Sequence, residues 1–246
     1  MAEKIINVIN KREVDRLFFV VATGRSGSNM LIELLDSIEN ASIRMELDMP
    51  DSTNKIIKPE EKALGIIQDY LNTRRWIGSK KENYSISGCK FLDSHVYKCD
   101  ITEEFLGKLH RDVRIIHLYR KNKLDQFLSL NLARKNNKWI SPIDKPEDYG
   151  TYSDFDITIN IDQFRSFIKS TERTYNKYIR LFPNAYIVDY ESLSDDPQKI
   201  FDGGLFDFLG VPPQQIEFRT RKQNPKPKEE IIVNLDEVRH HFPEYF

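Results

Sequence analysis

The segment Gly24-Arg-Ser-Gly-Ser-Asn29 has the composition of a loop that binds an anion. Its two glycines allow a tight turn that exposes backbone N–H groups, and Arg25 adds a positive charge. Phosphate groups bind such loops when a helix follows, because the N-terminal end of a helix carries a partial positive charge. We therefore expect a phosphorylated ligand to bind the loop residues Gly24, Arg25, Ser26, Gly27, Ser28 and Asn29.

The residues on either side of this loop have the patterns of a strand and a helix. Leu17–Ala22 is an uninterrupted apolar run, which is typical of a strand buried on both faces of a parallel sheet. After the loop, apolar residues recur at helical spacing from Met30 to Ile38. Strand, glycine loop and helix form a phosphate cradle. The alternative is an ordinary strand-to-helix turn that contains a basic residue.

The loop differs from the common loop of ATP- and GTP-binding enzymes. That loop has the form G-x-x-x-x-G-K-[ST], in which the lysine reaches the outer phosphates and the hydroxyl holds magnesium. Here Asn29 stands where the second glycine would be, and no lysine follows Gly27. The loop can hold an anion, but it lacks the parts that handle a magnesium nucleoside triphosphate.

Two more cations accompany predicted buried strands. Lys90 lies in the apolar segment Ile86–Leu92, and Arg120 follows the apolar segment Val113–Leu118. Strands that alternate with helices indicate a parallel sheet covered on both faces, whose ligands bind beyond the carboxyl ends of the strands. We therefore expect an α/β fold, with a central parallel sheet flanked by helices and a P-loop-like nucleotide site. This topology places together the loop at 24–29, the segment after Leu92 and Arg120.

Composition limits the class of protein. The length of 246 residues suits one domain, here 1–246, and the net charge of −1 gives no general surface for nucleic acid. Two cysteines indicate a reduced compartment, and the His and Cys residues show no zinc-site pattern. No apolar N-terminal stretch indicates a signal peptide or a membrane anchor, so we expect a cytoplasmic protein without membrane partners.

Four features, in one order, resemble the sulfotransferase superfamily that uses 3′-phosphoadenosine 5′-phosphosulfate (PAPS), in particular its bacterial members. They are the glycine loop, Arg120 with Ser129, the segment Tyr190-Glu-Ser-Leu followed by Asp196-Pro, and the basic tail Phe218–Asn224. The family's loop, of the type GRSGTN, holds the 5′-phosphosulfate of PAPS. The resemblance covers Leu17 to about Asn224 and implies PAPS as co-substrate, with 3′,5′-diphosphoadenosine (PAP) as product and no metal.

The resemblance also implies roles for residues that bind the nucleotide. Arg120 and Ser129 match the pair that binds the 3′-phosphate, although their spacing of nine leaves Lys121 as an alternative to Arg120. From the residues alone, a solvated cluster of basic residues at a strand end is the commoner explanation. The tail residues Arg219, Arg221 and Lys222 are candidates to close the nucleotide site, and an exposed charged tail is the alternative.

The transfer step needs cations near the sulfate and a base for the acceptor. Arg25 and Lys90 match the family's cations at the transferred group. Glu46 lies where some members carry the catalytic base, and we rank it ahead of His95 and then Asp93; a surface glutamate is the alternative. The position of His117 within an apolar strand indicates a histidine buried in the core.

The resemblance implies that a hydroxyl, less often an amine, of a small-molecule or sugar acceptor receives the sulfuryl group. Residues 40–58 and 137–160 are expected to wall the acceptor site. The sequence leaves the oligomeric state open. Two other functions remain as alternatives, a kinase that uses ATP with magnesium and a non-catalytic nucleotide-binding protein.

Overall fold

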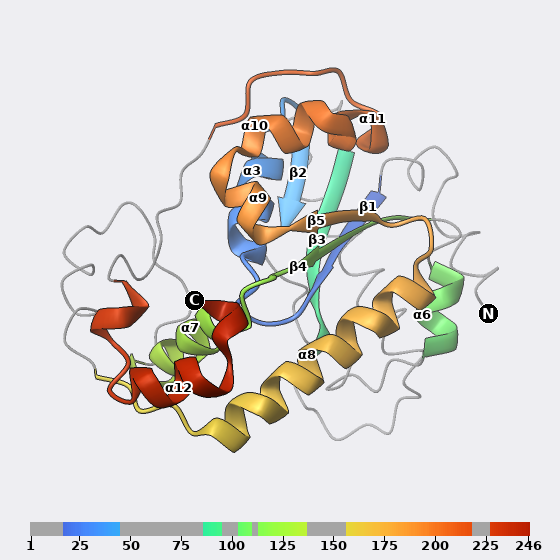
Figure 1. Ribbon diagram of the computed structural model, residues 1–246. Coiled ribbons are helices and arrows are strands. Elements are labelled where there is room, and N and C mark those ends of the chain that lie inside the picture. The colour runs from blue at the N-terminus through green and yellow to red at the C-terminus, as the bar shows by residue number, and fades with distance from the viewer. Residues whose placement is uncertain (1–16, 45–85, 95–102, 110–112, 137–155, 218–226) are drawn as a thin grey trace.

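A parallel sheet lies at the centre of the computed structural model, which describes residues 17–44, 86–94, 103–109, 113–136, 156–217 and 227–246 (Figure 1). The strands are β1 (Leu17–Ala22), β2 (Ala41–Arg44), β3 (Ile86–Leu92), β4 (Arg114–Tyr119) and β5 (Tyr186–Asp189). They are arranged in the order β2-β3-β1-β4-β5, and every neighbouring pair is parallel. The predicted α/β fold with a central parallel sheet is confirmed.

The apolar character of β1 follows from its place in the middle of this sheet. β1 pairs with β3 on one side and with β4 on the other, and all six of its residues are buried. Helices cover both of its faces, so no position of β1 meets water. The position of β1 directs the glycine loop that follows it to the middle of the sheet's carboxyl edge.

The first face of the sheet is covered by the helix after the loop and by a series of short helical turns. α3 (Ser28–Asp36) packs there with α9 (Tyr190–Asp195), α10 (Pro197–Ile200), the π-helical turn η3 (Phe201–Leu205) and α11 (Phe206–Leu209). The side chain of Asp196 accepts a hydrogen bond from the Lys199 N–H, as a helix cap does. The helical turns between Pro197 and Leu209 do not form one regular helix, because the backbone is not helical at Gly204, where φ is 131°.

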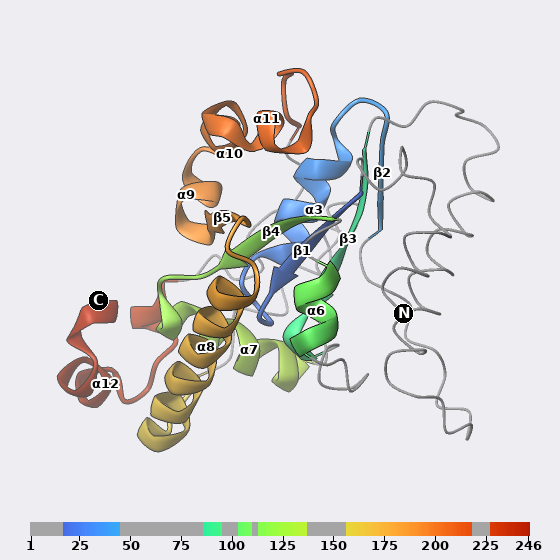
Figure 2. The same ribbon diagram turned by 90° about the vertical axis from the view of Figure 1, so that its right-hand side faces the viewer.

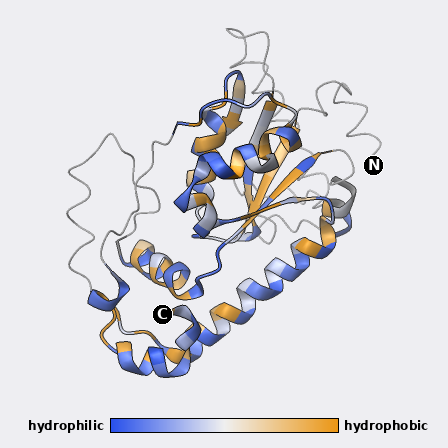
Figure 3. Cartoon of the chain, turned by 45° about the horizontal axis from the view of Figure 1, so that its top comes forward, coloured by the Kyte–Doolittle hydropathy of each residue, from blue (hydrophilic) through white to orange (hydrophobic). Residues whose placement is uncertain are grey.

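The opposite face carries the longest helix of the described segments. α8 (Ile161–Leu181) runs across this face, with α6 (Glu103–Leu109) beside its C-terminal part and α7 (Lys123–Asn136) nearer its N-terminal half (Figures 1 and 2). Figure 3 shows the strands largely in hydrophobic colours, whereas α8 has many hydrophilic residues along its length. In none of the described segments does a helix have both the length and the apolar character that a membrane span requires.

The C-terminal segment forms a second apolar cluster with α7 and α8. It contains η4 (Lys228–Glu230), α12 (Leu235–His241) and η5 (Pro243–Tyr245). Its backbone pairs with the segment before α8, since the Ile157 N–H donates to the Ile231 carbonyl at 2.8 Å. Phe164 of α8 packs against Phe242, with ring centroids 4.7 Å apart. This C-terminal segment, from η4 to η5, is therefore attached to the helices that border the carboxyl edge of the sheet.

Candidate functional site

The glycine loop after β1 makes a tight turn into α3. Arg25 and Gly27 both have left-handed backbones, with φ of 62° and 89°. The fully buried Ser26 donates from its hydroxyl to the Thr23 carbonyl at 2.8 Å, which fixes the turn. Gly27 is the residue before the first turn of α3 and supplies no side-chain cap to it. The N-terminus of α3 can therefore direct backbone N–H groups at an anion.

Lys90 stands beside the first turn of α3. It lies on β3 opposite Val20 of β1, and only 2% of it is exposed. Its ammonium group donates to the side-chain oxygen of Asn29 at 2.5 Å. The ammonium group is thus held next to the first turn of α3. The structure therefore brings a fixed cation from β3 to the end of the glycine loop.

α7 contacts the loop from the other side. Arg25 Nε donates to the Ser129 hydroxyl at 2.9 Å. The fully buried Gln126 donates its amide to both Thr23 Oγ1, at 2.9 Å, and the Gly24 carbonyl, at 2.8 Å. Gln126 was not predicted as a site residue, although it lies three positions before Ser129 and so near the same face of a helix.

Arg120 follows β4 and turns toward α7. Its guanidinium lies 3.4 Å from the Asp125 carboxylate, and 12% of its side chain is exposed. Asp125 and Ser129 are four residues apart on α7 and thus share one face, so Arg120 and Ser129 are brought to the same side of that helix. Lys121 points elsewhere, because its ammonium group pairs with Asp189 of β5 at 3.0 Å.

Tyr190, at the start of α9, lies between the loop and Arg120. The Arg120 guanidinium stacks over the Tyr190 ring at 4.4 Å from the ring centroid. A Cβ atom on Gly27 would lie 2.1 Å from the same ring, so only glycine permits this approach. Glu191, in the same Tyr190-Glu-Ser-Leu segment, has a structural role, because it accepts hydrogen bonds from the backbone N–H groups of Lys121 and Asn122, at 3.0 and 2.9 Å.

Asp93, the third candidate base, ties the end of β3 to α8. Its carboxylate accepts hydrogen bonds from Lys177 at 2.5 Å, Tyr178 at 3.1 Å and Thr174 at 3.4 Å. Burial, together with the neighbouring carboxylate, raises the pKa of Tyr178 far above its ordinary value, so the phenol stays a proton donor. These hydrogen bonds join the end of β3 to α8, which is a structural role. They agree with the placing of Asp93 last among the three candidate bases.

His117 is buried in β4 on the face covered by α8, as expected for a core histidine. Its ring lies 5.2 Å from that of Tyr175 and 5.4 Å from that of Tyr178, between ring centroids. Its Nδ1 atom is buried without a hydrogen-bond partner. Burial, with a smaller contribution from the positive charge of Lys123, lowers the pKa of His117 from 6.5 to about 4.

The lowered pKa of His117 predicts a loss of stability in acid. Between pH 6.5 and pH 4 the unfolded chain binds a proton that the folded protein excludes, so the free energy of unfolding falls as the pH falls. The slope approaches roughly 1.4 kcal/mol per pH unit, which gives about 2 kcal/mol between pH 7 and pH 5. Urea unfolding at both pH values, in the wild type and in His117→Leu, measures this difference.

The exposed His240 of α12 supplies the control. His240→Leu should keep the pH dependence of the wild type, whereas His117→Leu should reduce it by most of this amount. Equal pH dependence in the wild type and in His117→Leu would show that His117 does not cause the acid sensitivity.

Several predicted site residues lie outside the described part of the chain. They are the candidate bases Glu46 and His95 and the basic tail residues Arg219, Arg221 and Lys222. Most of the two expected acceptor walls, 45–58 and 137–155, also lies outside it. Within the described segments, no group of three His, Cys, Asp or Glu side chains is placed to hold a metal ion.

Comparisons with known proteins match most of the chain. A family profile described as "Sulfotransferase domain" matches residues 15–240. A crystal structure of a sulfotransferase from Alicyclobacillus acidocaldarius has a TM-score of 0.50 at 16% identity, with 93% of each chain covered, so it shows the same fold. A mouse sulfotransferase, SULT7A1 complexed with PAP, has a TM-score of 0.40 at 14% identity, with coverage of 87% of this chain and 66% of the mouse chain. No curated protein matches the sequence.

Proposed function

We propose that this chain, which belongs to the sulfotransferase family, transfers the sulfuryl group of PAPS to a hydroxyl, less often an amine, of a small-molecule or sugar acceptor. One observation carries the proposal. Three cationic side chains lie in or near one glycine loop: Arg25 within it, Lys90 of the neighbouring strand β3 on Asn29, and Arg120 after β4 on the Tyr190 ring that packs against Gly27. Fixed cations can neutralise the developing negative charge here, as magnesium does in kinases.

The described residues fit a nucleotide that carries two separate anionic groups. The loop and the N-terminus of α3 would hold the 5′-phosphosulfate. Arg120 and Ser129, which lie on one side of α7, would hold the 3′-phosphate, and a guanidinium suits a phosphate through its planar fork. The contact between Arg25 and Ser129 joins the two subsites. We propose that the tail residues Arg219, Arg221 and Lys222 close the nucleotide site.

PAPS supplies an activated sulfuryl group that an acceptor oxygen can attack in line. As the sulfur–oxygen bond to the phosphate breaks, negative charge grows on the bridging oxygen. Arg25 and Lys90 would stabilise that charge more than they stabilise the bound ground state, which accelerates the reaction. Glu46 would accept the proton of the acceptor hydroxyl, and His95 is the second candidate for this step.

Glu46→Gln tests the base. The amide cannot accept the proton, so we expect the rate of transfer to fall by roughly 10²–10⁴-fold while the affinity for PAP stays within experimental error. Initial rates and PAP titrations on the same preparation measure both quantities. His95→Gln is the matched variant, and a loss of turnover there with normal turnover in Glu46→Gln would transfer the role to His95. Loss of transfer with intact PAP binding would also exclude a purely nucleotide-binding function.

The reaction itself can be tested without knowing the acceptor. The protein is incubated with PAPS and with sets of phenols, alcohols, sugars and amines, and release of PAP is followed. We expect PAP release that depends on one acceptor class, needs no added metal and yields a sulfated product by mass spectrometry. Phosphorylation of an acceptor from ATP and magnesium, with no turnover of PAPS, would contradict the proposed function.

A further inference from the structure

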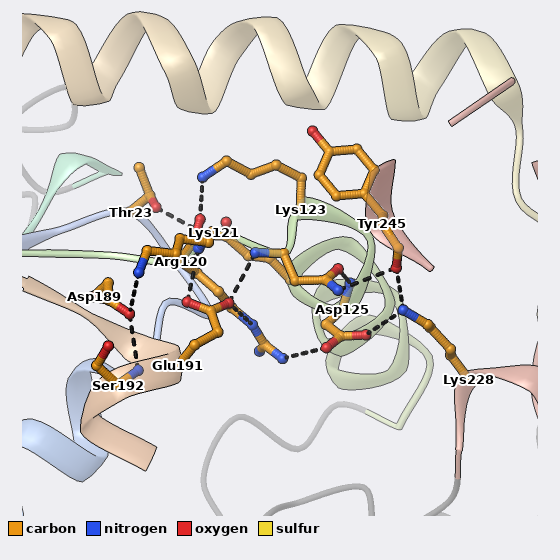
Figure 4. A network of polar contacts seen from close by, with 12 residues as sticks. Thr23, Arg120, Lys121, Lys123, Asp125, Asp189, Glu191, Ser192, Lys228 and Tyr245 are labelled. Carbon is orange, nitrogen blue, oxygen red and sulfur yellow. Dashed lines mark hydrogen bonds and ion pairs between the residues drawn. The ribbon is translucent and has the colours of Figure 1, made fainter. Parts of the chain in front are cut away.

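The contacts of Arg120 extend away from the glycine loop to the C-terminal segment. Figure 4 shows Asp125 between two cations, with Arg120 on one side and Lys228 on the other. One carboxylate oxygen lies 3.4 Å from the Arg120 guanidinium, and the other lies 4.0 Å from the Lys228 ammonium group. Lys228 belongs to η4, more than a hundred residues along the chain from Arg120.

Lys228 is held firmly in this position. Only 16% of its side chain is exposed, and its ammonium group donates to the backbone carbonyl of Tyr245. The ring of Phe246 lies on the same ammonium group, 4.8 Å from the ring centroid. The side-chain amide of Asn122 donates to the same Tyr245 carbonyl at 3.3 Å, which ties the C-terminal segment to the start of α7.

Arg120 depends on few contacts for its orientation. Its Nε atom is buried without a hydrogen-bond partner, and Glu191 lies 4.0 Å from that atom. Besides this longer ion pair with Glu191, its contacts are the ion pair with Asp125 of α7 at 3.4 Å and the ring of Tyr190. A change in the position or charge of Asp125 therefore reaches the guanidinium directly.

We propose that Lys228 is a positioning residue for the 3′-phosphate subsite, acting on Arg120 through Asp125. The positive charge of Lys228 neutralises part of the Asp125 carboxylate, which otherwise competes with a phosphate for Arg120. Its contact with the other carboxylate oxygen also fixes the orientation in which Asp125 holds the guanidinium. The inference rests on the proposed function, because it assigns Lys228 to a subsite for the 3′-phosphate of PAPS and PAP.

The test compares two nucleotides that differ only in the 3′-phosphate, PAP and adenosine 5′-phosphate. Lys228→Met removes the charge and keeps an apolar stem, and we expect it to weaken PAP binding about five- to tenfold, at the lower end of measured couplings between sites. The affinity for adenosine 5′-phosphate should stay unchanged. Lys228→Arg, which keeps the positive charge, should bind PAP with the affinity of the wild type. Calorimetric titration of the full-length protein measures all of these dissociation constants.

Arg239→Met is the matched control. Arg239 of α12 also stacks on Phe246, at 5.0 Å from the ring centroid, and the substitution changes the net charge equally. Its ion pair is with Asp236 of the same helix, at 4.0 Å, and not with Asp125, the residue through which Lys228 would act on Arg120. We expect wild-type affinity for PAP in Arg239→Met.

A double-mutant cycle tests whether Lys228 affects PAP binding through Arg120. In an Arg120→Ala background, Lys228→Met should have no further effect on PAP binding, because the residue on which Lys228 acts is gone.

The inference is overturned if Lys228→Met weakens the binding of both nucleotides equally, weakens the binding of neither, or behaves like Arg239→Met. If the wild type binds adenosine 5′-phosphate as tightly as PAP, or binds neither, the proposed function itself fails. A wild type that prefers PAP, with Lys228→Met unchanged, overturns this inference alone.

Discussion

Lys90→Met should lower kcat for sulfuryl transfer by roughly 10²–10³-fold, which is the usual cost of losing one group that stabilises charge in a transition state. Lys90 is almost fully buried and contacts Asn29 at the end of the glycine loop. Water cannot readily replace a cation in such a place. Methionine keeps the unbranched apolar stem, so the fold should persist. Initial rates at saturating PAPS, with the melting temperature as a check on folding, measure the effect.

Lys169→Met is the control for the change of charge. Lys169 is exposed on α8, and its replacement should leave kcat unchanged. The affinity of Lys90→Met for PAP should change much less than its kcat, because PAP lacks the sulfate that the cation serves. A kcat for Lys90→Met within about threefold of the wild type would show that Lys90 does not act in the transition state.

Gly27→Ala should reduce the free energy of unfolding by about 2–4 kcal/mol, from backbone strain and a steric clash together. The backbone at Gly27 is left-handed, which disfavours any side chain, and the new methyl group would overlap the Tyr190 ring. If the ring moves away, Arg120 loses the surface on which it stacks. We therefore expect the affinity for PAP to fall at least roughly tenfold as well.

Gly24→Ala provides the comparison within the same loop. A Cβ atom at Gly24 meets nothing within 4 Å, and its backbone is not left-handed. Urea unfolding should therefore show a change of less than about 0.5 kcal/mol for Gly24→Ala, as for substitutions that touch nothing. Equal stability of the two variants would mean that Tyr190 does not pack on Gly27 in solution.

Local patterns were enough to predict the centre of the fold. The apolar run of β1, the glycines and the helical spacing in α3 are close together in sequence, and each follows from burial or backbone geometry. β2 was missed, because Ala41–Arg44 is a short edge strand in a polar stretch and forms through backbone pairing with β3. The break at Gly204 could not be predicted either, since a glycine within a helical pattern does not reveal its φ angle.

The candidate site was predicted where its residues follow strand ends and missed where it depends on packing between distant elements. Arg25 lies in the loop after β1 and Arg120 comes directly after β4, and the topology of a parallel sheet alone brings such positions together. Gln126, Asp125 and Lys228 were not foreseen. Their roles depend on how α7 packs against the loop and how the C-terminal segment packs against α7, contacts that span about a hundred residues of sequence. No local pattern encodes them.

The most direct test of the central claim is a thermal-shift comparison of PAP with ATP and magnesium at equal concentrations, in the wild type and in Arg120→Ala. A ligand that binds only the folded protein, at about a hundred times its Kd, adds roughly 2.7 kcal/mol of stability. We predict that PAP raises the melting temperature of the wild type, that ATP with magnesium does so much less, and that Arg120→Ala removes the effect of PAP. Stabilisation by ATP with magnesium alone, or by neither ligand, would contradict a site built for a nucleotide with a 3′-phosphate.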